Sequence, residues 1–238
     1  VKVIGNRMYV LNNYRGLVIV NLEDDKNPYV EGSVQVLGHP VSMYIVDFLG
    51  FVIVSNAPTF DGSSQYSGAL YIIDLLDNTN PRIVQMVELT GYPTDSRRVG
   101  QVIYVVSNEE NYYHWGWGMR GGVMMDDMVL EIESSEPEEE EGPKTHVTSI
   151  AFTDPGNIGE KDSVEIDGNA GLIHASSFAI YVPQPNYDYK SPETKFIYVD
   201  ISDPKGDILV RDSIKVPGLL MDRYQMDHYK GTFRVVTQ

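Results

Sequence analysis

Four copies of one strand-rich pattern organise this sequence. In each copy, a β-rich segment ends in a polar residue and a hydrophobic residue, followed by an Asx-Pro turn, a second β-rich segment and a glycine. The closing glycines are Gly38, Gly91, Gly168 and Gly218, so successive copies are spaced by 53, 77 and 50 residues. A period near 50 residues is typical of four-stranded units and is too long for leucine-rich or ankyrin repeats.

Two further strand candidates follow each glycine, for example Val41–Val46 and Phe51–Val54 after Gly38. Val, Ile and Tyr dominate these segments, as a half-buried pleated surface prefers, and no helical stripe of useful length appears. The sequence therefore predicts an all-β chain: a β-propeller of four-stranded antiparallel blades, present as a partial or truncated ring.

The whole chain, residues 1–238, is predicted to be a single propeller segment. Blade boundaries are expected near residues 38, 91, 168 and 218, with an insertion over 108–145. We expect three complete blades, with residues 1–38 supplying the last strands of an earlier blade and 219–238 the first strands of a later one. Val1 falls directly into a strand pattern and the last residues read as a strand cut short, so we expect both ends to be truncated.

Composition narrows the classes of partner. The net charge of −16 disfavours nucleic acid, because no basic patch offsets the repulsion of phosphates. No apolar run approaches the roughly 18 residues of a membrane helix, so no membrane span is expected in these residues. Cysteine is absent, which excludes disulfides, thiolate metal sites and cysteine nucleophiles.

Six segments carry a resemblance to known protein sequences. Gly16–Leu22 with Asn27-Pro28 resembles the LVIVD repeat, as do its copies at 69–81 and 195–204. Residues 95–106 resemble the Ser-Arg strand pair, and residues 174–182 the small-residue inner strand, of the secreted archaeal and bacterial proteins with a C-terminal β-propeller domain. Residues 222–237 resemble the motif of these proteins in which a Met-Asp-x-Tyr turn precedes a glycine and an Arg-bearing strand. The long acidic insertion, Arg223 and Tyr224 depart from the family pattern. The resemblance implies a secreted or surface-anchored propeller, and it supplies no catalytic residues.

Aromatic residues gather in the three segments that join second to third strands, namely 56–68, 108–145 and 183–192. Because equivalent connections lie at one end of neighbouring blades, these residues are predicted to form a shared binding surface. Tyrosine and tryptophan beside glycine make adaptable contacts with protein or glycan partners. The residues are Tyr66, Tyr112, Tyr113, Trp115, Trp117, Tyr187 and Tyr189. The alternative is that they are ordinary loop aromatics.

Polar residues on the predicted inner strands are candidates to line the central channel. They are Asp95, Arg97, Arg98, His174, Asp222, Arg223 and Asp227. The competing interpretation is structural, because buried charges are usually paired and Arg–Asp links could join neighbouring blades.

No metal ligand set is expected from sequence spacing. No pair of the five histidines has zinc-ligand spacing. The Glu138–Glu141 run leaves calcium as a weak alternative, because it lacks the spaced oxygens and glycine of a calcium loop.

Two functions remain open at this point. The favoured one is a non-catalytic extracellular or cell-surface module that binds a protein or a glycan, or takes part in a larger assembly. The alternative is a hydrolase or lyase that acts on a polysaccharide through channel carboxylates, which requires two acids roughly 5–10 Å apart in an open pocket. Asp95, Asp222 and Asp227 are the candidates for that role.

Overall fold

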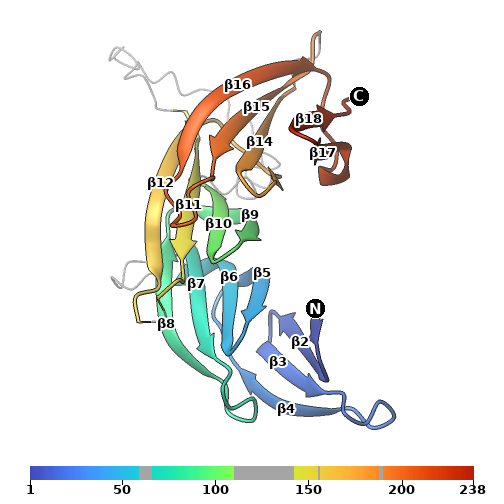
Figure 1. Ribbon diagram of the computed structural model, residues 1–238, viewed down its shortest axis with the longest axis vertical. Helices are drawn as coiled ribbons and strands as arrows, with labels where there is room; N and C mark the ends of the chain where they lie inside the picture. The colour runs from blue at the N-terminus through green and yellow to red at the C-terminus, as the bar shows by residue number, and fades with distance from the viewer. Residues whose placement is uncertain (59–65, 110–141, 155, 188–189) are drawn as a thin grey trace, which may run out of the picture.

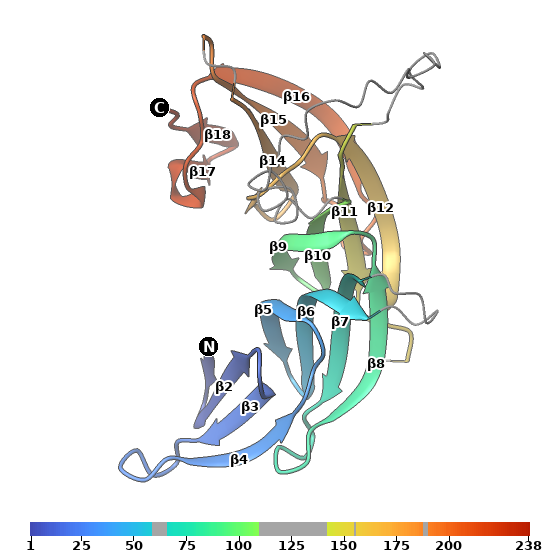
Figure 2. The same cartoon turned by 180° about the vertical axis from the view of Figure 1, so that it is seen from behind.

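The computed structural model describes residues 1–58, 66–109, 142–154, 156–187 and 190–238. These residues form four antiparallel four-stranded sheets and one two-stranded sheet, each with its strands in chain order. Figures 1 and 2 show the sheets following one another around an open arc, with the first strand of each sheet on the concave side and the fourth on the convex side. The predicted fold class is confirmed, and the sheets do not close into a ring.

The strand bounds are as follows. The first sheet contains β1 (Lys2–Ile4), β2 (Arg7–Asn12), β3 (Gly16–Asn21) and β4 (Tyr29–Val34). The second contains β5 (His39–Val46), β6 (Leu49–Pro58), β7 (Tyr66–Asp74) and β8 (Arg82–Leu89). The third contains β9 (Tyr92–Val99), β10 (Val102–Asn108), β11 (Lys144–Ala151) and β12 (Gly159–Asp167). The fourth contains β13 (His174–Ala175), β14 (Ala179–Asn186), β15 (Glu193–Asp200) and β16 (Leu209–Pro217), and the last contains β17 (Met226–Tyr229) and β18 (Thr232–Val235).

The N-terminal region differs from the sequence-based expectation. Residues 1–38 were expected to supply only the last strands of a blade, whereas they form a complete four-stranded sheet. The additional strand is β1, which has three residues and pairs with β2 from Lys2 to Ile4. The sequence around Val1 does indicate a strand, but three residues are too few to identify it as a separate first strand of the sheet.

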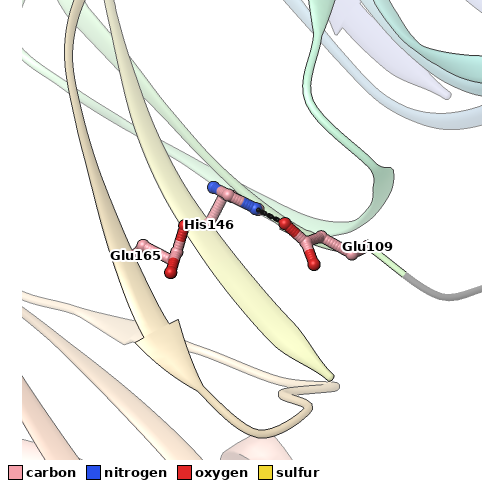
Figure 3. Close-up of side chains that lie close together, drawn as sticks. All are labelled: Glu109, His146 and Glu165. Atoms are coloured by element: carbon pink, nitrogen blue, oxygen red, sulfur yellow. Dashed lines mark hydrogen bonds and ion pairs between the residues drawn. The ribbon is translucent and has the colours of Figure 1, made fainter. Parts of the chain in front are cut away.

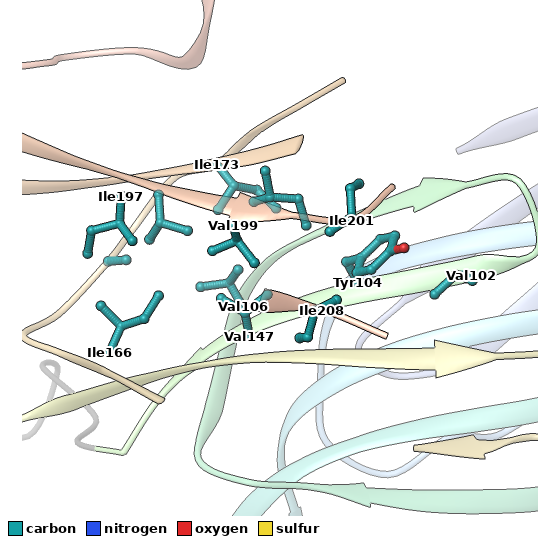
Figure 4. Close-up of a cluster of buried hydrophobic side chains, with 13 residues drawn as sticks. Val102, Tyr104, Val106, Val147, Ile166, Ile173, Ile197, Val199, Ile201 and Ile208 are labelled. Carbon is teal, nitrogen blue, oxygen red and sulfur yellow. The ribbon is translucent and has the colours of Figure 1, made fainter. Parts of the chain in front are cut away.

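The central strands of the second and third sheets are apolar on both faces because each of these sheets packs between two others. In β6, Phe51 and Ile53 pack toward the third sheet, while Val52 and Val54 pack toward the first. β10 is buried at all seven positions. Sheets covered on both faces give near-continuous hydrophobic runs instead of strict alternation. Figure 4 shows the cluster between the third and fourth sheets, where Tyr104 of β10 packs among aliphatic side chains.

The glycines between sheets have a positive φ, and Gly38, Gly91 and Gly218 also have close backbone neighbours. Gly91 has φ of 72°, and a Cβ built on it would lie 2.4 Å from the carbonyl oxygen of Asn108 at the end of β10. Gly38 repeats the arrangement, with φ of 111° and the Ser55 carbonyl oxygen at 2.7 Å. Only glycine combines this backbone conformation with so close an approach.

The turns between third and fourth strands are built on aspartate, in a register that differs from the predicted Asx-Pro pairing. In each turn an aspartate Oδ1 accepts the backbone N–H two residues later, and its carbonyl oxygen accepts the N–H three residues later. The equivalent residues are Asp24, Asp77, Asp154 and Asp203. Pro204 therefore follows its turn aspartate directly, whereas Pro28 and Pro81 come four residues after theirs. The aspartate side chain, which mimics a backbone turn, is the shared element.

The segment after Gly218 also differs from prediction. Leu220–Met226 was expected to be an inner strand, but Arg223–Gln225 form a short 3-10 helix and the strand begins only at Met226. Asp222 accepts the backbone N–H of Tyr224, and the Gln225 side chain accepts the backbone N–H of Asp222. This reciprocal capping box holds the turn in place of an extended strand.

Candidate functional site

A polar pocket lies on the concave side of the arc, where residues from the starts of four sheets and from the 3-10 helix meet. Its volume is about 470 Å³, within the range of small-molecule sites. The lining residues are Val1, Lys2, Leu11, Pro40, Val41, Ser42, Met43, Tyr44, Thr94, Asp95, Ser96, Arg97, Gly171, Leu172 and Arg223. Three of the predicted channel residues, Asp95, Arg97 and Arg223, therefore line one pocket.

Arg97 and Asp95 form an ion pair that also joins two sheets. Nη1 of Arg97 donates to Oδ1 of Asp95 at 2.5 Å and to the Ser96 carbonyl at 2.6 Å, and Nη2 donates to the Ile173 carbonyl at 3.2 Å. Asp95 also accepts backbone N–H groups from Ser96 at 2.8 Å and Ile173 at 3.4 Å. Both groups are thus held by contacts within β9 and to the residue that precedes β13.

Three hydroxyl groups meet on another wall of the pocket. The Ser96 Oγ lies 2.5 Å from the Ser42 Oγ and 2.9 Å from the Tyr44 hydroxyl, which links β9 to β5. Burial raises the pKa of the Tyr44 phenol, so this hydroxyl keeps its proton at neutral pH. The wall offers hydrogen-bonding groups without adding charge.

The charge of the pocket is opposite to that of the chain. Lys2, Arg97 and Arg223 contribute three cationic side chains, and Asp95 is the one carboxylate among the lining residues. The chain as a whole carries −16. Within the described residues, the guanidinium of Arg223 makes no hydrogen bond or ion pair, and it remains exposed. The pocket therefore offers a locally positive surface to a ligand.

Comparison with known families decides the assignment. The sequence model of the Beta propeller domain matches residues 1–238. The chain belongs to the Beta propeller domain family. Among solved structures, this propeller is similar to a crystal structure described as a functionally unknown protein from Desulfotomaculum acetoxidans DSM 771. That match has 10% sequence identity and a TM-score of 0.34, and covers 92% of this chain and 83% of the other. No curated protein matches the chain.

The other predicted channel residues lie away from the pocket of the propeller. Arg98 points to the opposite face of β9, where it donates to the Gly100 carbonyl at 2.9 Å and lies over the Phe152 ring. His174 packs against Tyr181 and Phe233, and burial lowers the pKa of its imidazole.

The two remaining candidate acids also have structural roles. Asp222 caps the 3-10 helix, and Asp227 pairs with Arg234 across the β17–β18 hairpin. Neither is among the residues that line the pocket.

The predicted aromatic surface falls mostly outside the described residues. Tyr112, Tyr113, Trp115, Trp117 and Tyr189 lie there, as does the Tyr66 side chain, although the Tyr66 backbone begins β7. Tyr187 is described and is 73% exposed. The three segments do connect second to third strands, as expected. The shared aromatic surface stays a prediction.

Sequence reasoning missed Lys2, the hydroxyl groups of Ser42, Tyr44 and Ser96, and a cluster of side chains at one end of the third sheet. Lys2 belongs to the short β1, and Ser42 and Tyr44 alternate with apolar residues in β5, so no local signal marked them. This cluster comprises Glu109, His146 and Glu165 (Figure 3), whose potential ligand atoms all lie within 4.8 Å of one another. These residues are 37 and 19 positions apart in sequence, and only strand pairing brings them together.

The described residues contain no helix with the length and apolarity needed to cross a membrane.

Proposed function

We propose that this propeller is a non-catalytic binding module whose concave-side pocket accepts an acidic sugar unit of a glycan. The observation that carries the proposal is the reversal of charge: three cationic side chains and one carboxylate line a pocket in a chain of net charge −16. A ligand with a carboxylate or sulfate group would find charge-assisted hydrogen-bond donors there. Hydroxyl groups of a sugar would find partners in Ser42, Tyr44 and Ser96.

The contacts of the carboxylates favour binding over glycoside hydrolysis. Hydrolysis of this type needs two carboxyl groups facing the substrate, one of them free to transfer a proton. Asp95 is the one carboxylate among the lining residues, and it is committed to Arg97 and to two backbone N–H groups. Asp222 and Asp227, the other candidates, hold the helix cap and the Arg234 pair.

We also propose that the protein acts outside the cell or at its surface. The support is the resemblance of Gly16–Leu22 and its copies to LVIVD repeats of secreted archaeal and bacterial propellers. Fractionation of the source cells with an antibody to this chain tests this part of the proposal. Recovery in the medium or on the surface is expected, and recovery only in the cytosol would contradict it.

Calorimetric titration with matched oligosaccharides tests the pocket proposal. An oligomer of galacturonic acid should bind at least about tenfold more tightly than a neutral oligomer of equal length, because hydrogen bonds to a charged group contribute about 1.5–3 kcal/mol. Raising the salt concentration should weaken binding of the acidic oligomer more than binding of the neutral one. Equal affinity for both oligomers, or binding of neither, would contradict the assignment of an acidic glycan. Binding of an acidic peptide in place of the glycan would point to a protein partner.

The aromatic surface is a separate part of the prediction. Replacing Trp115 and Trp117 with alanine should weaken binding of a larger partner if those residues contribute. If every partner interaction is intact in that double variant, the aromatic surface has no binding role.

A further inference from the structure

Two carboxylates and one imidazole meet at one end of the third sheet, on three adjacent stretches of chain. Glu109 directly follows β10, His146 lies on β11, and Glu165 lies on β12. The strand register places Ser107 opposite His146 and His146 opposite Glu165. Figure 3 shows His146 between the two glutamates. β pairing fixes the positions of His146 and Glu165, which gives a more precise geometry than a loop would. Glu109 lies just beyond β10, where its backbone N–H donates to the Lys144 carbonyl at 3.0 Å.

The imidazole of His146 is nearly buried, whereas the two carboxylates remain open to solvent. The side chain of His146 is 11% exposed, and those of Glu109 and Glu165 are 44% and 50% exposed. Nε2 of His146 lies 2.9 Å from Oε1 of Glu109. A shielded nitrogen ligand thus faces two accessible oxygen ligands, and the cluster can be reached from solvent.

We propose that Glu109, His146 and Glu165 form a binding site for a divalent transition metal ion of the zinc class. One imidazole and two carboxylates are a donor set that zinc accepts, with a fourth position left for water. Calcium prefers six to eight oxygen ligands, so this set does not suit it. The proposal is independent of the pocket on the concave side.

The present separations require only a small adjustment to hold the ion. Ligand atoms at about 2.0–2.2 Å from a tetrahedral zinc ion lie roughly 3.4 Å from one another. The ligand atoms here lie within 4.8 Å of one another. Because both glutamates are half-exposed, a change of side-chain rotamer in either can close the difference without moving a strand.

Lys144 is the competitor for one of the ligands. Its Nζ lies 2.5 Å from Oε1 of Glu165 and 3.8 Å from a carboxylate oxygen of Asp167, and the contact with Lys144 lowers the pKa of Glu165. A carboxylate has two oxygens and several lone pairs, so Glu165 can keep Lys144 on Oε1 and offer Oε2 to the metal. Asp167 also gives the ammonium group a second partner when the metal binds.

Zinc titration of the full chain after removal of metals by EDTA dialysis tests the site. The wild-type chain should bind zinc chloride saturably, and its thermal midpoint should rise with zinc concentration because the ion binds the folded state. Glu165→Gln should weaken this site at least about tenfold, which is on the scale of losing a metal-site contact. His146→Gln should do the same, and circular dichroism establishes whether it is folded.

Glu160→Gln is the matched control. It removes the same charge from an exposed position of the same strand, opposite Ile150 and away from His146. Its zinc affinity should equal that of the wild type. The proposal is overturned if wild-type protein binds no zinc, if Glu165→Gln titrates like the wild type, or if Glu160→Gln weakens zinc binding as much as Glu165→Gln. Tighter binding of calcium chloride than of zinc chloride would also overturn it.

Discussion

Nη1 of Arg97 lies 2.5 Å from Oδ1 of Asp95, and Nη2 of the same arginine reaches the Ile173 carbonyl of the next sheet at 3.2 Å. One guanidinium therefore neutralises the pocket carboxylate and bridges two blades. The bridge matters because β13 has only two residues, and its pairing with β14 contributes few hydrogen bonds. Arg97 thus contributes both to the proposed binding surface and to the packing between blades.

Loss of this arginine should destabilise the fold. Arg97→Ala is expected to lower the free energy of unfolding by about 2–3 kcal/mol, because Asp95 is only 13% exposed and would lose its charged partner. Denaturant titration measures the change. Arg82→Ala is the control, since Arg82 is 67% exposed, its partner Asp74 is 28% exposed, and this pair should contribute less than about 1 kcal/mol. Equal effects of the two substitutions would contradict the bridging role.

Gly91 and Gly100 separate the effect of close packing from that of backbone conformation. Both have positive φ, of 72° and 58°, but a Cβ on Gly91 would meet the Asn108 carbonyl, whereas one on Gly100 meets nothing within 4 Å. Gly100→Ala should cost about 1 kcal/mol through strain alone. Gly91→Ala should cost about 3 kcal/mol or more, because the backbone must also move. Thermal unfolding of the two variants provides the comparison, and similar midpoints would refute the argument.

Tyr104 should make the propeller sensitive to alkali. Burial, with a smaller contribution from the charge of Asp203, raises the pKa of its phenol from 10.0 to about 12. The folded state therefore holds this proton at a pH where the unfolded state has released it. The resulting stability is fully present below pH 10 and is lost as the pH rises toward 12. Tyr104→Phe should flatten the decline of unfolding free energy over that interval. An unchanged slope would show that Tyr104 ionises normally.

The blade architecture could be predicted because its signals are local. Runs such as Phe51–Val54 and Val102–Val106 identify strands buried on both faces, and Gly38, Gly91, Gly168 and Gly218 mark the passages between sheets. The sequence pattern treated Asn27-Pro28 and Asp203-Pro204 as equivalent positions, which was wrong, because Asp203 is equivalent to Asp24. Proline is conspicuous in sequence, but the aspartate side chain that accepts the turn N–H groups is the equivalent element.

The pocket could be predicted only in part because it depends on long-range geometry. Asp95 and Arg97 lie on a recognisable inner strand, so their position followed from the blade pattern. Asp222 was also predicted to lie on an inner strand. A 3-10 helix capped by Asp222 and Gln225 replaces that strand, and the Asp222 carboxylate accepts the Tyr224 N–H. Lys2 lies on a three-residue strand, which is too short to be identified from sequence as an inner strand. The cluster around His146 depends on pairing between β11 and β12 and on a glutamate beyond the end of β10.

The central claim is that the cationic concave-side pocket binds the ligand. Arg223→Ala removes an exposed guanidinium from the pocket without removing any hydrogen bond or ion pair made by that group within the described residues. Arg15→Ala is its counterpart, an exposed arginine in the turn between β2 and β3 and outside the pocket. Affinity for oligogalacturonate, measured by calorimetry, should fall about tenfold in Arg223→Ala and stay at the wild-type value in Arg15→Ala. Equal affinities of the two variants would place the binding surface elsewhere.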